Sequence, residues 1–202
     1  LARALVFQPR LVLMDEPLGA LDKNLREQMQ YEIKHIHERI GITVVYVTHD
    51  QSEALTMSNR IAVFDDGVVQ QLSTPDILYE QPENSFVAEF IGENNTLIGT
   101  LKKEDGEYCE VDLDGGGTVK ALKINVASIG DKTKLSIRPE RVVINSKDSS
   151  DNIFEGLVKE LIYLGDHVRA RLNVCGDENF IVKIPNEGNV SIKENSKINV
   201  SW

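Results

Sequence analysis

The stretch LVLMDEPLGALD, residues 11–22, decides the fold of the first part of the chain. It opens on a continuous apolar run and then reaches Pro17, which stops further strand pairing, so it predicts a strand that is buried on both faces. Asp15 and Glu16 end that strand. Ligands bind at the carboxyl ends of the strands in open α/β sheets, and the two carboxylates are therefore candidates for a functional site.

The residues that follow predict a helix and a second strand. Apolar residues recur at spacings of four and three over 25–40, which predicts an amphipathic helix that Gly41 closes. The β-branched run 43–48 predicts another buried strand, and it leads directly into His49. Strands that alternate with helices are typical of a parallel sheet. Because consecutive parallel strands end at the same edge, we expect Glu16 and His49 to face one shared point.

Further elements are expected up to residue 92, and after it the pattern changes. The first group comprises a helix over 51–57 that begins with a capping box of Asp50 and Glu53, a hairpin with an Asp66-Gly67 turn, a short helix after Thr74-Pro75, and a helix over 84–91. Beyond residue 92, short alternating stretches separated by Gly, Asn and Asp turns predict a small β-barrel or β-sandwich. We find no convincing internal repeat. The prediction is an α/β part over 1–92 followed by an all-β part over 93–202.

Composition excludes several classes of function. The 202 residues carry 32 acidic and 22 basic side chains, a net charge of −10, which argues against nucleic acid as a partner. The two cysteines, Cys109 and Cys175, stand apart from any Cys/His cluster, so the sequence predicts neither a disulfide scaffold nor a zinc site. Apolar runs fall far short of the roughly 20 residues that a membrane-spanning helix needs. These features fit a protein of the reducing cytosol.

The polar strand ends allow two interpretations. One carboxylate of Asp15 and Glu16 can hold a hard cation while the other reaches a water that attacks phosphorus, and His49 can bind a phosphate or orient a carboxylate. Alternatively, the acidic pair only ends a strand in a polar turn, and His49 only caps or packs. The residues by themselves leave both interpretations open.

The string at 11–22, with Val47-Thr48-His49-Asp50 about 30 residues on, closely resembles the nucleotide-binding subunits of ABC transporters. The resemblance implies that Asp15 is the Walker B aspartate near Mg²⁺, Glu16 the catalytic base for water, and His49 the switch histidine. It also implies that Leu18 to Asp22 form the D-loop at the ATP site, which meets the partner subunit, with Asp22 among the residues that serve the cofactor. The implied fold is the C-terminal half of a P-loop NTPase (RecA-like) domain, with ATP and Mg²⁺ as cofactors.

Two motifs of that family do not occur in these residues. There is no GxxxxGK[ST] string for the phosphates and no LSGGQ motif, although Leu1-Ala2-Arg3-Ala4-Leu5 resembles the helix that follows the latter. We therefore expect the chain to be a fragment that is inactive alone and to bind ATP poorly. Hydrolysis is expected of a full subunit with more chain before Leu1.

The second part extends the resemblance. Ile137-Arg138-Pro139-Glu140-Arg141 and Tyr163-Leu164-Gly165 resemble the TOBE region of importer ATPases, an OB-like β domain with a regulatory role. Residues 135–142, 90–95 and 180–186 look most like spermidine/putrescine importers, while iron(III), sugar, glycerol-phosphate and phosphonate importers share the layout.

The resemblance implies an ATPase that drives solute uptake from the cytoplasmic face of the inner membrane, to which it is peripheral. Its implied partners are a second ATPase subunit in a homodimer, the permease subunits and, indirectly, a periplasmic solute-binding protein. The alternative is a non-catalytic binding module: an OB-like face could take an oligonucleotide, which the acidic charge opposes, or the fragment could serve regulation or dimerisation.

Overall fold

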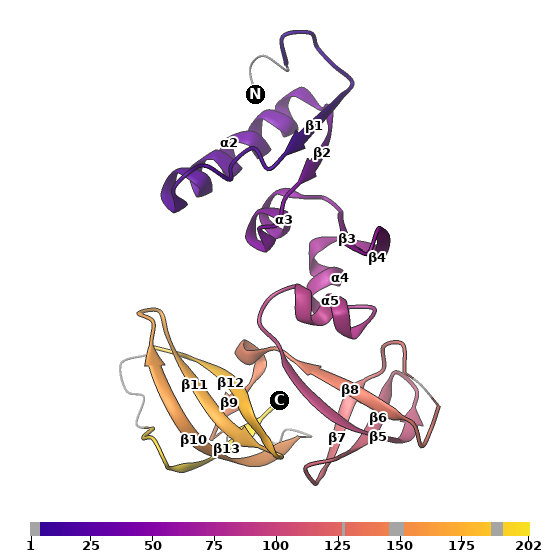
Figure 1. Ribbon diagram of the computed structural model, residues 1–202, viewed down its shortest axis with the longest axis vertical. Helices are drawn as coiled ribbons and strands as arrows, with labels where there is room; N and C mark the ends of the chain where they lie inside the picture. The colour runs from indigo at the N-terminus through magenta and orange to yellow at the C-terminus, as the bar shows by residue number, and fades with distance from the viewer. Residues whose placement is uncertain (1–4, 127, 146–151, 187–191) are drawn as a thin grey trace. The chain divides into compact units, whose positions relative to one another are not determined.

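A computed structural model describes residues 5–126, 128–145, 152–186 and 192–202. The chain divides into two compact units, residues 1–81 and 82–202 (Figure 1). The first is α/β and the second is mainly β, which confirms the predicted order of fold classes. In this division the helix that precedes Gly92 belongs to the second unit. A module boundary between residues 92 and 93 stays a prediction.

The first unit is built around two parallel strands and one long helix. Strand β1 (Leu11–Asp15) pairs with β2 (Thr43–Val47), and helix α2 (Lys23–Ile40) connects them and lies along the pair (Figure 1). The carboxylate of Asp22 accepts a hydrogen bond from the Leu25 amide at 3.0 Å and so caps the start of α2. Gly41 ends the helix in a left-handed conformation with φ of 69°, as predicted.

The strands of this pair are covered on one face only. Val12 and Met14 point into a core completed by Ile33 of α2, whereas Leu13 is 73% exposed and Val47 is 53% exposed. The prediction of strands buried on both faces is therefore wrong for the described residues. The apolar run correctly indicated a strand, but α2, the only long helix among the described residues of this unit, packs on one side of the pair.

The remaining elements of this unit agree with the expected order, with one correction. They are α3 (Gln51–Met57), β3 (Ile61–Asp65), β4 (Val68–Ser73) and α4 (Pro75–Glu80). Asp50 caps α3 by accepting the amides of Ser52 and Glu53. Its own amide, however, donates to the Thr48 hydroxyl at 3.0 Å, so Glu53 does not complete the predicted capping box and is used elsewhere.

In the part of the chain that the structure describes, the second unit contains the short helix α5, the single 3₁₀ turn η1 and two antiparallel sheets. In the sheets the strand orders are β7-β6-β5-β8 and β12-β11-β10-β13-β9. The elements are α5 (Ser85–Phe90), β5 (Asn95–Asp105), β6 (Tyr108–Leu113), β7 (Thr118–Leu122), β8 (Lys132–Ile137), η1 (Pro139–Arg141), β9 (Val143–Ile144), β10 (Ile153–Tyr163), β11 (His167–Val174), β12 (Asp177–Pro185) and β13 (Lys197–Ser201).

The two sheets are repeats of one another. Strands β10 to β13 are connected and ordered as β5 to β8 are, and each repeat begins with an 11-residue strand. That strand is bulged between Leu101 and Lys103 in the first repeat and between Val158 and Glu160 in the second. The pairing registers of the two repeats correspond except near the β11–β12 turn, where the pairing shifts between Leu172 and Val174 and the β6–β7 pair has no such shift. The sequence shows no convincing repeat, so the likeness of the two sheets lies in strand order and pairing.

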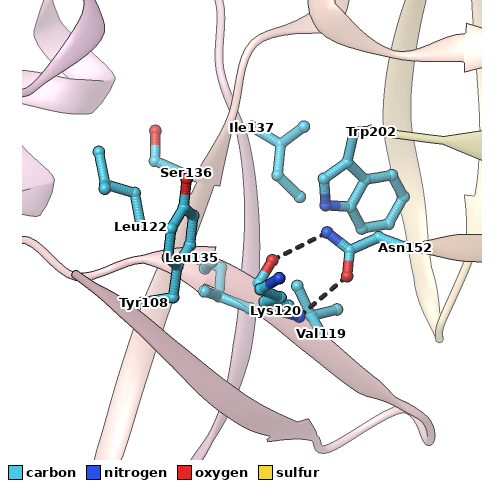
Figure 2. Close-up of a pocket in the computed structure, with 10 residues that line it drawn as sticks. Tyr108, Val119, Lys120, Leu122, Leu135, Ser136, Ile137, Asn152 and Trp202 are labelled. Carbon is cyan, nitrogen blue, oxygen red and sulfur yellow. Dashed lines mark hydrogen bonds between the residues drawn. The ribbon is translucent and has the colours of Figure 1, made fainter. Parts of the chain in front are cut away.

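Each repeat closes the free edge of the other with an asparagine. Asn95 pairs with both the amide and the carbonyl of Ile181 in β12, at 2.7 and 2.8 Å. Asn152, at the equivalent position before β10, pairs in the same way with Lys120 in β7, at 2.9 and 2.9 Å (Figure 2). A side-chain amide offers one donor and one acceptor, so it satisfies the groups that an edge strand leaves open.

The turns of the two repeats also touch. Gly115, between β6 and β7, packs against Cys175 and Gly176, which occupy the corresponding turn between β11 and β12. A Cβ atom at Gly115 would lie 1.5 Å from the Cys175 carbonyl oxygen. One continuous core of buried residues, including Val111 and Leu172, joins the two sheets beneath these turns.

Candidate functional site

Glu16 and His49 lie together at the carboxyl ends of β1 and β2. The Nδ1 atom of His49 is 2.9 Å from Oε1 of Glu16. Both side chains are open to solvent, with exposed fractions of 50% for Glu16 and 78% for His49. The strand register, in which Asp15 pairs with Val47, sets this approach because each side chain follows its strand by one or two residues. The expected meeting of the two side chains is confirmed.

Glu16 adopts a backbone conformation that is unusual for a residue with a side chain. Its φ is 42°, in the left-handed region that favours glycine. Two backbone hydrogen bonds hold it there: its amide donates to the Val47 carbonyl at 2.9 Å and its carbonyl accepts from the Gly19 amide at 3.2 Å. Strained residues of this kind cluster at functional sites, where the surrounding structure fixes a side chain in one direction.

The hydrogen bond to Glu16 raises the pKa of His49 above its ordinary value of 6.5, and the negative charge of Glu16 adds to the effect. The protonated imidazole is therefore the form that this pair favours. The stabilisation that the pair contributes is present below pH 6.5 and is lost as the pH rises through the raised pKa.

We expect an NMR titration of the chain to place the midpoint of His49 above 6.5. In Glu16→Gln the midpoint should fall towards 6.5, because the amide accepts a hydrogen bond without carrying a charge. Glu27→Gln, at an exposed position on α2, is the matched control and should leave the midpoint of His49 where it is. A midpoint that is the same in Glu16→Gln and in the unsubstituted chain would show that the pair does not form in solution.

A buried carboxylate supports the His49 turn from inside the unit. Glu53 is 3% exposed and accepts hydrogen bonds from the Tyr46 hydroxyl and the Thr48 hydroxyl, both at 2.9 Å. Burial raises the pKa of Tyr46, and the hydrogen bond to Glu53 raises it further. Arg26 of α2 reaches the same group from the other side, with its Nε 3.8 Å from Glu53. The sequence patterns did not indicate this network, because it joins residues of different elements.

Asp15 lies at the end of its strand, as the apolar run predicted, and Asp22 lies at the start of α2. Asp15 ends β1 with an exposed side chain beside Glu16. Mg²⁺ in proteins is commonly held by one or two carboxylates together with water and substrate phosphate, and the exposed carboxylate of Asp15 fits that donor type. Within the described ranges no group of three or more His, Cys, Asp or Glu side chains is placed to hold a metal ion. Asp22 caps α2, and a role for it at a cofactor stays a prediction.

The second unit has a cavity of about 300 Å³ beside the Asn152–Lys120 pair (Figure 2). Its walls include Tyr108, whose ring lies 5.1 Å from the Lys120 ammonium, and Trp202, which stacks on Phe154. The space lies next to the edge that Asn152 closes and is lined mainly by apolar and aromatic side chains.

Among helices that the structure describes, none is both long and apolar enough to cross a membrane. The stretch Leu1-Ala2-Arg3-Ala4, which was compared with the helix after the LSGGQ motif, lies outside the described residues.

Comparison with known proteins finds a matching family model, similar curated proteins and a similar solved structure. The TOBE domain family matches residues 135–202. The spermidine/putrescine import ATP-binding protein PotA of Pseudomonas aeruginosa (strain UCBPP-PA14) is 46% identical over 189 residues, covering 92% of this chain and 52% of that protein. PotA of Rubrobacter xylanophilus is 40% identical over 205 residues, covering 100% and 54%. The chain thus spans about half the length of the curated relatives it matches.

A solved structure was also found, that of the cytoplasmic molybdate-binding protein ModG with molybdate bound. It is 19% identical, has a TM-score of 0.46, and the match covers 53% of this chain and 88% of that one.

Proposed function

We propose that this chain forms the C-terminal half of the ATP-binding subunit of an ABC importer and supplies part of its site for ATP hydrolysis; its identity of 46% and 40% to two PotA proteins and the TOBE match over residues 135–202 support the proposal. The observation that carries the proposal is the pairing of Glu16 with His49 at 2.9 Å, at the ends of two adjacent parallel strands. This edge of a parallel sheet is where ligands bind, and both side chains are open to it.

In the proposed mechanism Glu16 accepts a hydrogen bond from the water that attacks the terminal phosphoryl group and takes up its proton. Its carboxylate is aimed by the constrained backbone at φ of 42° and by the hydrogen bond from His49. His49 in its protonated form donates to Glu16 and can turn to the γ-phosphate as negative charge gathers there. Asp15 would hold Mg²⁺, which offsets the charge of the phosphates when bound.

The open face of the β1–β2 pair supports the proposal that further chain completes this domain. Leu11, Leu13, Val45 and Val47 form an apolar strip that is between 48% and 73% exposed. Strands of parallel sheets are normally covered on both faces. We propose that the remaining half of the subunit, which bears the phosphate-binding loop, covers this strip and extends the sheet.

The further parts of the proposal concern cargo and partners. The identity to PotA proteins favours polyamines as the transported solute. We propose a homodimer that works at the cytoplasmic face of the inner membrane, contacts permease subunits directly and receives solute through them from a periplasmic binding protein. The β unit would then regulate or stabilise the dimer.

Uptake of labelled spermidine and putrescine tests the cargo. The completed subunit should restore uptake to a bacterial strain whose own polyamine importer lacks its ATPase, when it is supplied together with its cognate permease and binding protein. Uptake should require Glu16. Restored uptake of a sugar, iron(III) or phosphonate, with no uptake of polyamine, would contradict the proposed cargo and leave the ATPase role in place.

A further inference from the structure

Arg26 connects two turns of the first unit that lie far apart in the sequence. Its Nη2 donates to the Leu21 carbonyl at 3.1 Å, and its Nη1 donates to Oδ2 of Asp50 at 3.0 Å. Leu21 belongs to the Leu18–Asp22 turn, which follows Glu16, whereas Asp50 directly follows His49. One guanidinium group therefore spans the segments that carry both members of the Glu16–His49 pair.

The geometry on the Asp50 side leaves little freedom. Oδ1 of Asp50 accepts the Ser52 amide at 2.8 Å and caps α3, while Oδ2 accepts Arg26. The two oxygens thus fix the carboxylate between the helix and the arginine. Hydrogen bonds from Ser52, and also the bond from Arg26, hold the pKa of Asp50 below its usual value, so the carboxylate is charged at neutral pH.

The geometry on the Leu21 side is also anchored. The Leu21 amide donates to the Leu18 carbonyl at 3.1 Å, and Leu18 is buried in the core at 4% exposure. Asp22 then starts α2, from which Arg26 itself projects one turn later. A displacement of the Leu18–Asp22 turn would therefore move Arg26 in two ways: through its hydrogen bond to the Leu21 carbonyl and through the start of α2.

From these contacts we propose that Arg26 is a positioning residue that locks the Leu18–Asp22 turn to the His49–Asp50 turn, so that a displacement of one turn moves the other. A planar guanidinium with several fixed donors can hold a carbonyl and a carboxylate at once, whereas the ammonium of a lysine is a single compact charge. The consequence for hydrolysis rests on the proposed function: a neighbouring subunit that contacts the Leu18–Asp22 turn would adjust His49 through Arg26.

Amide hydrogen exchange measured by NMR on the full chain tests this coupling without ATP. Asp50→Asn keeps the helix cap, because asparagine caps helices as well as aspartate does, but it removes the bond to Arg26, because the amide nitrogen that replaces Oδ2 is a donor. We expect exchange at the Leu21 amide to accelerate about fivefold in this variant, although the substitution lies 29 residues further along the chain.

A double-mutant cycle separates coupling from general loosening. Arg26→Met should accelerate exchange at Leu21 by about the same factor, and adding Asp50→Asn to Arg26→Met should have no further effect. Arg26→Lys should rescue little of the loss. Arg39→Met, an exposed arginine near the end of the same helix, is the matched control and should not change exchange at Leu21.

Additive effects of Arg26→Met and Asp50→Asn, or an unchanged Leu21 amide in Asp50→Asn, would overturn the proposal. If Arg26→Met fails to fold, Arg26→Lys completes the same cycle. Because the readout requires no nucleotide, a negative result here is distinct from a failure of the proposed ATPase function, which is decided by turnover.

Discussion

Glu16→Gln in the completed subunit is expected to lower the rate of ATP turnover by a factor on the order of 10² to 10⁴, while ATP binding is retained. Glutamine has the shape of glutamate and can still accept the hydrogen bond from His49, but it does not take up a proton from water at neutral pH. The loss should therefore appear in kcat and not in the dissociation constant for ATP.

Steady-state phosphate release and equilibrium binding of ATP measure the two quantities separately. Glu27→Gln removes one exposed carboxylate from α2, away from the strand ends, and should leave both unchanged. His49→Ala should also lower kcat, since it removes the group that orients Glu16. Normal turnover in Glu16→Gln would remove Glu16 from the role of base and with it the central part of the proposed mechanism.

Gly115→Ala should destabilise the second unit by about 2 to 3 kcal/mol, because the added methyl group would meet the Cys175 carbonyl oxygen at 1.5 Å. The clashing atom belongs to the backbone of the β11–β12 turn, which no side-chain rotation can move aside. The two turns must therefore move apart, and the core residues beneath them must shift. Urea unfolding, followed through the single Trp202, should show a lower midpoint.

Gly116→Ala is the matched control for this substitution. Gly116 has φ of 96° but no atom within 4 Å of the added Cβ, so it carries backbone strain without a clash. We expect it to cost about 1 kcal/mol. A larger loss for Gly116→Ala than for Gly115→Ala would show that the two turns do not pack closely in solution.

The sequence predicted the elements of the first unit well because their signals are local. Apolar spacing located α2, Gly41 ended it, and the run before Asp15 marked a strand. The number of covered strand faces was not predictable in this way, since it depends on which other elements pack there. The contacts of Arg26 could not be predicted from the sequence for a similar reason, because no spacing rule links Arg26 to Asp50, which lies 24 residues away.

The repeat in the second unit could not be recognised from the sequence, because its two halves have few identical residues at matching positions. Matched positions keep residues that backbone geometry requires, such as Asn95 and Asn152, which pair with edge strands, and Gly99 and Gly156, where a Cβ would strike the neighbouring strand. At the other positions a buried site needs only an apolar residue and an exposed site only a polar one, and many different sequences meet these requirements. The symmetry is held in hydrogen-bond register more than in amino-acid identity.

The exchange of asparagines between the repeats also limits the order in which the β unit can be completed during synthesis. Asn95 leaves the ribosome 86 residues before Ile181, the residue whose backbone it pairs with. Lys120 likewise precedes Asn152 by 32 residues. Edge strand β7 of the first sheet therefore stays open only until Asn152, just before β10, has been translated, whereas edge strand β12 of the second sheet emerges after the asparagine that closes it.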